Sequence, residues 1–290
     1  MEAITSSMGL MAAASAALGW AQRRERAARS ARRRLSLDAV RQGIALMTVV
    51  QQHRGMAAAL LNGDTGFAGR LAEKQREVDA TLAELGTGFA RVPEFAAGGR
   101  RLDAIRAAWA QLCQGVRGYS AEQSFSAHTT LVQQVLYLLG DMGERGGLLE
   151  ARAPALGALA EVLLLRLPLL AESIGQARAL GTGFAAQGRC GAVGRIRLSF
   201  LERRIGECLA GLGVVLDSPA LAAPAQRCRH QVGRLLATIE VDLIGAERIT
   251  LAPDAYFRCA TEAIDACLAL WQAAELVTRQ ALAAGRQAAS

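Results

Sequence analysis

The chain has 290 residues with only six prolines, and 52% of its residues are hydrophobic although only 4% are aromatic. β-Sheets favour β-branched and aromatic residues, whereas this chain is rich in Ala, Leu, Gly and Arg, as expected for helices that pack through small residues. The scarcity of proline leaves room for long, uninterrupted helices. The composition therefore excludes a sheet protein and predicts an all-α fold.

The net charge of +7 is concentrated near the N-terminus. Residues 1–34 hold seven Arg and two Glu, a balance of +5, so the rest of the chain carries only +2 (7 − 5). A polyanion-binding surface over the whole molecule is therefore excluded. Nucleic acid is not expected as a partner either, because the Arg tract lacks interleaved aromatic residues and a folded platform.

The residue types that carry chemistry form no recognisable motif. Six cysteines and three histidines are scattered without a CxxC pair or a Cys/His cluster. We therefore expect no metal site and no cofactor, and we interpret the cysteines as small buried hydrophobes in a reducing compartment. Nucleophile elbows, HExxH helices, dinucleotide fingerprints and kinase motifs are also missing from the sequence, so we do not expect an enzyme.

The N-terminal segment, residues 1–35, is expected to lie apart from a main domain at 36–290. Residues 4–21 are apolar, but Ser, Thr, Gly and Ala dilute the stretch and drive membrane insertion only weakly. Positive charges follow it in an Arg-rich linker, whereas a secretory signal would place them before it. We expect a cytoplasmic protein, and weak membrane association through residues 4–21 is the alternative.

The first half of the main domain is predicted to hold four helices. Ser36 is a candidate N-cap for the first helix, and Asn62-Gly63 is its stop signal. The expected helices occupy residues 36–62, 69–86, 98–118 and 121 to just before Pro154. Four helices of this length predict an antiparallel bundle over about 36–150.

The second half repeats this organisation. Its helices are expected at residues 154–188, 195–212, 218–245 and 252–282. Pro168 is expected to kink or restart the first of them, and Pro253 suits the first turn of the last. The prediction is therefore two stacked four-helix bundles of long antiparallel helices, the second over about 151–290.

One polar interruption breaks the apolar face of the first helix, in "QQHRGMAAALLNGD" (51–64). A spacing of three or four places Arg54 and Gln51 on the same face as Val40, Ile44, Met47, Ala58 and Leu61. An arginine does not deprotonate to escape burial, so Arg54 needs either a counter-charge or a bound anion. Pairing with an internal Asp or Glu, or extension to the bundle edge, is the simpler explanation, and the spacing alone does not exclude it.

Arg178 occupies a comparable position in the second half. It shares a face with Leu167, Leu170, Ile174, Gly181 and Ala185, and "QARALGTGFAAQG" (176–188) loosely repeats "QHRGMAAALLNG" (52–63). Two buried arginines that face each other without acids repel, and a small planar anion between them would relieve the repulsion. Gln51, Gln52, His53 and Gln176 could add contacts, although His53 points about 100° around the helix from Arg54.

"QQHRGMAAALLNGD" followed by "GRLAEKQREVDATLAEL" resembles the nitrate- and nitrite-sensing (NIT) domain family. "LPLLAESIGQARALGTGFAAQG" and "APDAYFRCATEAIDACLAL" are similar to stretches of helical sensor domains, so the resemblance covers roughly 36–285. It implies two four-helix bundles with nitrate or nitrite bound between them by arginines.

By position, the resemblance assigns ligand contacts to Arg54 and Arg178, with Arg234 and Arg248 as candidates for a third arginine. His53 stands where some members carry a second adjacent arginine. NIT domains usually precede an output module, and none is visible after the last helix. The resemblance therefore implies a stand-alone sensor that signals through a protein partner, and we expect a homodimer because such bundle sensors often associate through long helices.

Two functions follow from these observations. The first is a non-enzymatic sensor that binds a small planar anion, nitrate or nitrite, between its bundles. The second is a helical interaction or scaffold protein with a vestigial anion site, which docks on a membrane or a partner through its basic N-terminus.

Overall fold

The computed structural model describes residues 2–150, 154–213 and 219–287, and these residues are almost entirely helical. The predicted all-α class is therefore confirmed. The first helices are α1 (Glu2–Leu61), α2 (Phe67–Ala90), α3 (Gly99–Gly115) and α4 (Ala121–Arg145), with the short turns η1 (Pro93–Gly98) and η2 (Val116–Gly118) flanking α3. The later elements are α5 (Pro154–Glu161), η3 (Val162–Arg166), α6 (Leu167–Gln187), α7 (Ala192–Ala210), η4 (Pro219–Leu221), α9 (Ala222–Thr238), η5 (Ile239–Ile244) and α10 (Pro253–Gln287).

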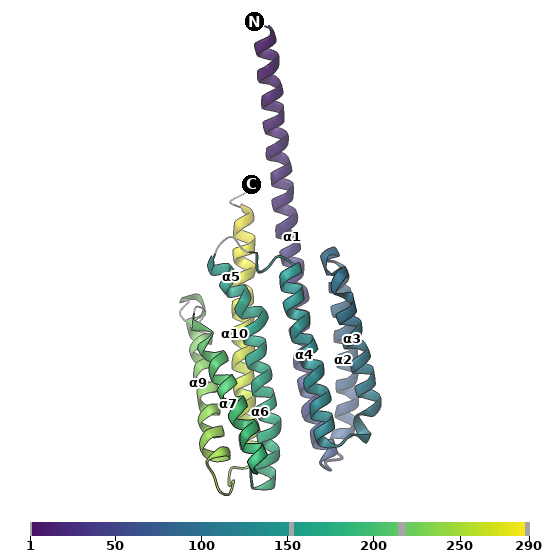
Figure 1. Cartoon of the computed structure of the whole chain (residues 1–290), viewed down its shortest axis with the longest axis vertical. Helices are drawn as coiled ribbons and strands as arrows, with labels where there is room; N and C mark the ends of the chain where they lie inside the picture. Colours follow the sequence, from purple (N-terminus) through teal and green to yellow (C-terminus); the bar gives the residue numbers. More distant parts are fainter. Residues whose placement is uncertain (1, 151–153, 214–218, 288–290) are drawn as a thin grey trace.

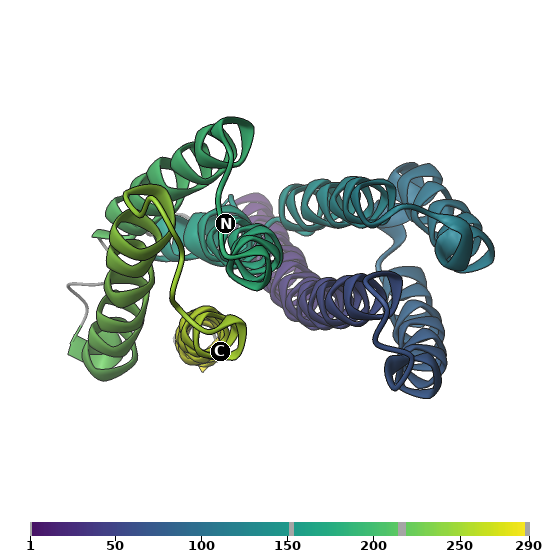
Figure 2. The same ribbon diagram turned by 90° about the horizontal axis from the view of Figure 1, so that it is seen from below.

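The helices gather in two groups that lie side by side (Figures 1 and 2). The first group consists of α1 to α4, and the second consists of α5, α6, α7, α9 and α10, in which η3 joins α5 to α6 as one continuous helical rod. The two groups meet where α1 contacts α6 and α10 and where α4 contacts α6 and η3, and we call this contact region the seam. The finer prediction of two stacked four-helix bundles remains an interpretation of this arrangement.

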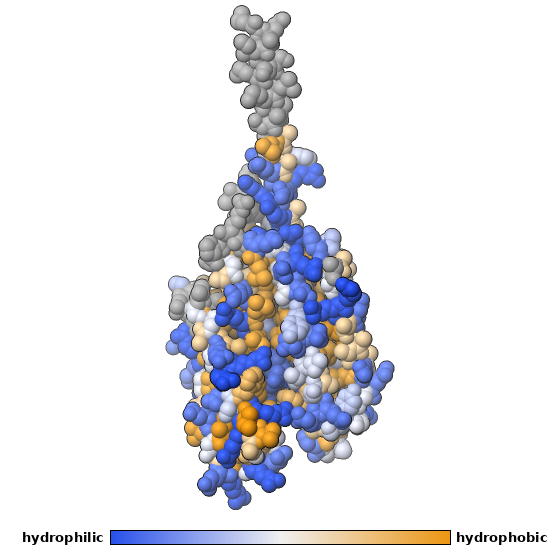
Figure 3. Space-filling view, in the orientation of Figure 1, coloured by the Kyte–Doolittle hydropathy of each residue, from blue (hydrophilic) through white to orange (hydrophobic). Residues whose placement is uncertain are grey.

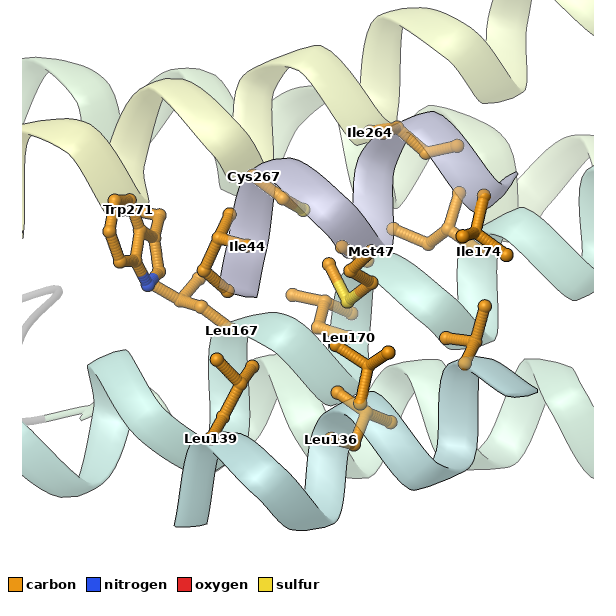
Figure 4. Packing of buried hydrophobic residues seen from close by; sticks show 14 of the residues in the cluster. Ile44, Met47, Leu136, Leu139, Leu167, Leu170, Ile174, Ile264, Cys267 and Trp271 are labelled. Atoms are coloured by element: carbon orange, nitrogen blue, oxygen red, sulfur yellow. The ribbon is translucent and has the colours of Figure 1, made fainter. Parts of the chain in front are cut away.

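Apolar side chains from all four helices of the seam fill it (Figure 4). Burial of this apolar surface holds the two groups together, at roughly 25 cal/mol for each Å² removed from water. The labelled residues are Ile44 and Met47 of α1, Leu136 and Leu139 of α4, Leu167, Leu170 and Ile174 of α6, and Ile264, Cys267 and Trp271 of α10. Any polar group in this seam therefore needs a partner within it.

Helix α1 does not begin at Ser36, so the predicted N-cap there is wrong. The helix is continuous from Glu2 to Leu61, and the Ser36 hydroxyl donates a hydrogen bond to the Arg32 carbonyl one turn earlier, at 2.9 Å. Ser36 is fully buried against Gly146, where an added Cβ would lie 2.1 Å from its Oγ. The Ala- and Arg-rich stretch before Ser36 favours helix, and no proline interrupts it, so the chain has no physical reason to stop there. The predicted stop is confirmed, since α1 ends at Leu61 and Gly63 has φ 101°.

The N-terminal part of α1 leaves the body of the protein as a single rod (Figure 1). Nearly all of residues 17–28 are exposed, and Figure 3 shows hydrophilic residues together with a few hydrophobic ones along this stretch. Arg33 anchors the rod where it meets the body, because its Nε donates to the Gly147 carbonyl at 2.7 Å. Within the described residues, no helix is both long enough and apolar enough to span a membrane.

The helical form of the rod changes next to Pro168, where a kink or restart was predicted. The five-residue π-helical turn η3 ends at Arg166 and joins α5 to α6, which carries Pro168 in its first turn. Proline lacks an N–H, and its ring clashes with the carbonyl four residues earlier, so a widened turn lets the chain continue in nearly the same direction. Pro253 is the first residue of α10, which confirms the other proline prediction. The rod delivers α6, with Arg178, to the seam.

Candidate functional site

Arg54 is buried at the seam and paired with a carboxylate. Only 2% of the residue is exposed. Its Nη1 donates to Oε1 of Glu172 at 2.7 Å, and its Nη2 donates to Oε2 at 3.2 Å. Two parallel bonds of this kind are the strongest geometry between a guanidinium and a carboxylate. The pair therefore ties α1 of the first group to α6 of the second.

Three neutral groups complete the surroundings of this pair. Gln51 Nε2 donates to Oε2 of Glu172 at 2.7 Å, and Gln176 Nε2 donates to Oε1 at 2.9 Å. Arg54 Nη1 also donates to the Thr129 hydroxyl of α4 at 3.2 Å. Each oxygen of Glu172 thus accepts two hydrogen bonds, which offsets the cost of burying its charge.

A glycine on α6 lets the two helices approach at this point. A Cβ added at Gly175 would lie 2.8 Å from Nη2 of Arg54 and 3.6 Å from the amide of Gln51. On the α4 side, the ring of Phe125 lies 5.6 Å from the Arg54 guanidinium carbon. The guanidinium is therefore enclosed by a small residue, an aromatic face and the polar groups that accept its hydrogen bonds.

Glu172 was not among the predicted site residues, and the prediction that the two arginines face each other without an acid is wrong. The counter-charge of Arg54 is an internal carboxylate, which was the simpler of the two explanations for its burial. The available signal was a lone acidic residue within the apolar stretch "LPLLAESIG", four positions before Gln176 and six before Arg178. The sequence alone did not reveal that Glu172 faces α1.

Arg178 lies beside this pair, and its own charge is not neutralised in the same way. Its Nη1 donates to the Thr261 hydroxyl of α10 at 3.0 Å, and its guanidinium carbon lies 4.9 Å from the centre of the Phe257 ring. Burial and the nearby charge of Arg54 lower the pKa of Arg178 to about 10, although Asp265 and Glu172 act in the opposite direction. Among the described residues, no carboxylate forms an ion pair with Arg178. The cluster of Arg54, Glu172 and Arg178 therefore carries one more positive charge than negative.

The other predicted contacts divide into two that join the cluster and four that do not. Gln51 and Gln176 belong to it through Glu172, whereas Gln52 is exposed and accepts a hydrogen bond from Lys74. Arg234 is exposed on α9, where it pairs with Glu262 at 3.2 Å, and Arg248 is exposed before α10. His53 is fully buried but faces the interior of the first group. From α10, Thr261 contacts the cluster through Arg178. The binding of an anion by any of these residues stays a prediction.

His53 forms a buried hydrogen-bonded chain with a second histidine. Its Nδ1 lies 2.7 Å from Nε2 of His128, whose Nδ1 lies 2.6 Å from the Ser124 carbonyl oxygen. A carbonyl only accepts, so His128 carries its proton on Nδ1 and accepts from His53 at Nε2. His53 Nε2 is then an acceptor, and it is buried beside the edge of Trp109 with no hydrogen-bond partner in the described part of the chain. Burial lowers the pKa of His53 to about 4 and that of His128 to about 3.

This histidine pair predicts a loss of stability in mild acid. Both groups are neutral in the folded state and titrate near pH 6.5 when unfolded, so their contribution is complete above pH 6.5 and is lost as the pH falls towards 4. The free energy of unfolding is expected to fall by about 1.4 kcal/mol per pH unit for each histidine in this window. Urea unfolding between pH 7.5 and 4 measures this slope.

The double variant His53→Phe/His128→Leu is the control for the acid prediction. It keeps every carboxylate, so the difference between its slope and that of the wild type isolates the two imidazoles. Equal slopes for the two proteins above pH 4 would contradict the assignment of neutral, buried histidines.

In the part of the chain that the structure describes, no group of three or more His, Cys, Asp or Glu side chains is placed to hold a metal ion. The seam instead gathers directional N–H donors, which bind the Glu172 carboxylate, and the additional positive charge of Arg178. Such a site is suited to a small anion with oxygen atoms in one plane.

One family model matches most of the chain. Residues 45–279 match the family described as nitrate and nitrite sensing (NIT). Among solved structures, the chain is similar to "Structure of the NasR transcription antiterminator", with a TM-score of 0.71 and 18% sequence identity over 91% of this chain and 72% of that one. At this identity the likeness establishes a shared fold. No curated protein sequence matches this one.

Proposed function

Since the chain belongs to the nitrate- and nitrite-sensing (NIT) family, we propose that it is a regulatory sensor that binds nitrate or nitrite at the seam, through the cluster of Arg54 and Arg178. The resemblance found in the sequence is confirmed at the level of the family. The family is one of sensors, which agrees with the expectation that the chain is not an enzyme.

The observation that carries the proposal is that Arg178 forms no ion pair among the described residues, although the exposed Asp265 acts on its charge from a longer distance. Its guanidinium is half-buried and stacked on Phe257, but its hydrogen-bond partner at the seam is the neutral hydroxyl of Thr261. A buried positive charge is costly unless an anion lies beside it. One monovalent anion balances the surplus charge of the cluster, and nitrate and nitrite are monovalent, planar and rich in oxygen.

Sensing then follows from the position of the cluster between the two groups. An anion that binds one arrangement of α1 against α6 more tightly than another shifts the population towards that arrangement. We propose that this shift is read by a protein partner or a second copy of the chain, in the cytoplasm.

A thermal titration with nitrate tests the proposal. At about one hundred times its dissociation constant, nitrate should stabilise the folded protein by about 2.7 kcal/mol, and the melting temperature should rise by several degrees. Arg178→Gln removes the surplus charge and should abolish the rise. Arg203→Gln, at an exposed arginine of α7, is the matched control and should leave it intact.

The thermal titration also distinguishes the sensor from the second candidate function, a docking protein. The rod of α1 exposes Leu18 and Trp20, each 62% exposed, beside its arginines, and this surface favours a docking protein with a vestigial anion site. No rise with either nitrate or nitrite at millimolar concentrations would overturn the sensor and support this second function.

A further inference from the structure

We propose that Glu172 is a tethered anion: its carboxylate fills the anion position on Arg54 in the unliganded protein, and the sensed anion must displace it. This inference rests on the proposed function. It adds that Glu172 competes with the sensed anion for Arg54. It also adds that the exchange of one anion for the other would alter the contact between the two groups of helices.

The geometry of the carboxylate matches that of the expected ligand. Oε1 and Oε2 of Glu172 face Nη1 and Nη2 of Arg54 at 2.7 and 3.2 Å. Nitrite and nitrate present two oxygen atoms in one plane to the same guanidinium edge, just as a carboxylate does. The position on Arg54 is therefore shaped for a planar anion and already occupied by one.

The neighbouring donors require that some anion always fills this position. Gln51 and Gln176 both donate to the carboxylate, at 2.7 and 2.9 Å, and Arg54 is buried. If Glu172 turned away with nothing in its place, these donors would be left unpaired in a desolvated seam. If a second anion takes the place of the Glu172 carboxylate, the donors stay paired and this desolvation cost is avoided.

Arg178 provides a destination for the displaced carboxylate. Both residues lie on α6, the charge of Glu172 partly opposes the lowering of the Arg178 pKa, and Arg178 has no ion-pair partner among the described residues. Arg54, Arg178, Glu172 and one monovalent anion together are neutral (+2 − 1 − 1). After the exchange Glu172 no longer links α6 to α1, so the seam loses a direct tie between the groups.

Isothermal titration with nitrate and nitrite tests the exchange in three proteins. In Glu172→Gln no charged competitor remains, so the affinity should rise by roughly tenfold or more over the wild type. Glu161→Gln changes the net charge by the same amount at a half-exposed pair with Arg166 and should leave the affinity unchanged.

Arg54→Met/Glu172→Met removes the whole pair and should abolish binding, because the exchange site itself is gone. Buried ion pairs are often replaced by apolar residues without loss of folding. Melting curves check that this variant folds, and Arg54→Gln/Glu172→Gln replaces it if it does not.

The outcomes separate the exchange from the proposed function. Binding by the wild type with no gain in Glu172→Gln would overturn the exchange alone. Wild-type affinity in the folded pair variant would also overturn it, because the anion would then use Arg178 without Arg54. No binding by any of the proteins would overturn the proposed function, and the exchange with it.

Discussion

Replacing Arg54 by methionine is expected to lower the free energy of unfolding by about 3–5 kcal/mol, because the change leaves the carboxylate of Glu172 buried without its counter-charge. Glu172 is 2% exposed, and Arg54 supplies two of the four hydrogen bonds that its oxygens accept. Methionine fills much of the volume of the arginine stem, so the loss reports the charge rather than a cavity. Chemical denaturation at pH 7.5 measures it.

Two further variants make this prediction specific. Arg54→Met/Glu172→Met removes both charges and should recover most of the lost stability. Arg106→Met breaks an exposed pair with Asp103 and should change the stability by less than about 1 kcal/mol. If the single Arg54 variant lost no more than the Arg106 variant, Arg54 and Glu172 would not form the buried pair described here.

Replacing Trp271 by alanine is the second large change, with an expected loss of about 3–5 kcal/mol. Trp271 lies at the seam with Ile44 and Leu167 nearby, and it is 3% exposed (Figure 4). Its Nε1 also donates to the Leu163 carbonyl at 2.8 Å, within the π-helical turn η3. The substitution therefore removes apolar burial and a hydrogen bond that fixes the entry of α6.

The variant Trp271→Phe distinguishes the contribution of the hydrogen bond from that of the packing, because phenylalanine keeps an aromatic ring but has no N–H donor. Its loss should be intermediate, because a net hydrogen bond is worth about 1 kcal/mol and part of the ring volume is also removed. Trp20→Ala, at an exposed tryptophan of α1, should stay within about 0.5 kcal/mol of the wild type. Equal losses at Trp20 and Trp271 would contradict the buried seam.

Much of the fold follows from local patterns. The three-and-four spacing in the first helix predicted one buried face, and Val40, Met47 and Gln51 are indeed buried. The stop at Asn62-Gly63, the interruption at Pro168 and the start at Pro253 were also predictable, because each depends on the backbone of a few adjacent residues. Ser36 was misread because a serine that caps a helix and one that bonds back within a helix look alike in sequence.

The candidate site was only half predictable. From its spacing, the sequence by itself determined that Arg54 lies on a buried face and therefore needs a negative partner, because an arginine keeps its charge when buried. Only the tertiary structure decided which partner it has. Glu172 stands 118 positions away on another helix, and it meets Arg54 only because Gly175 lets α6 approach α1 at that point.

The same distinction applies to Arg178. The sequence placed it on an apolar face, but its surroundings depend on Phe257 and Thr261 of α10, about eighty positions later, and it has no ion pair among the described residues. Helical periodicity sets which side chains turn inward, because it depends on neighbours in the chain. The charge balance of a buried cluster depends on which helices pack together, and that is a property of the folded seam.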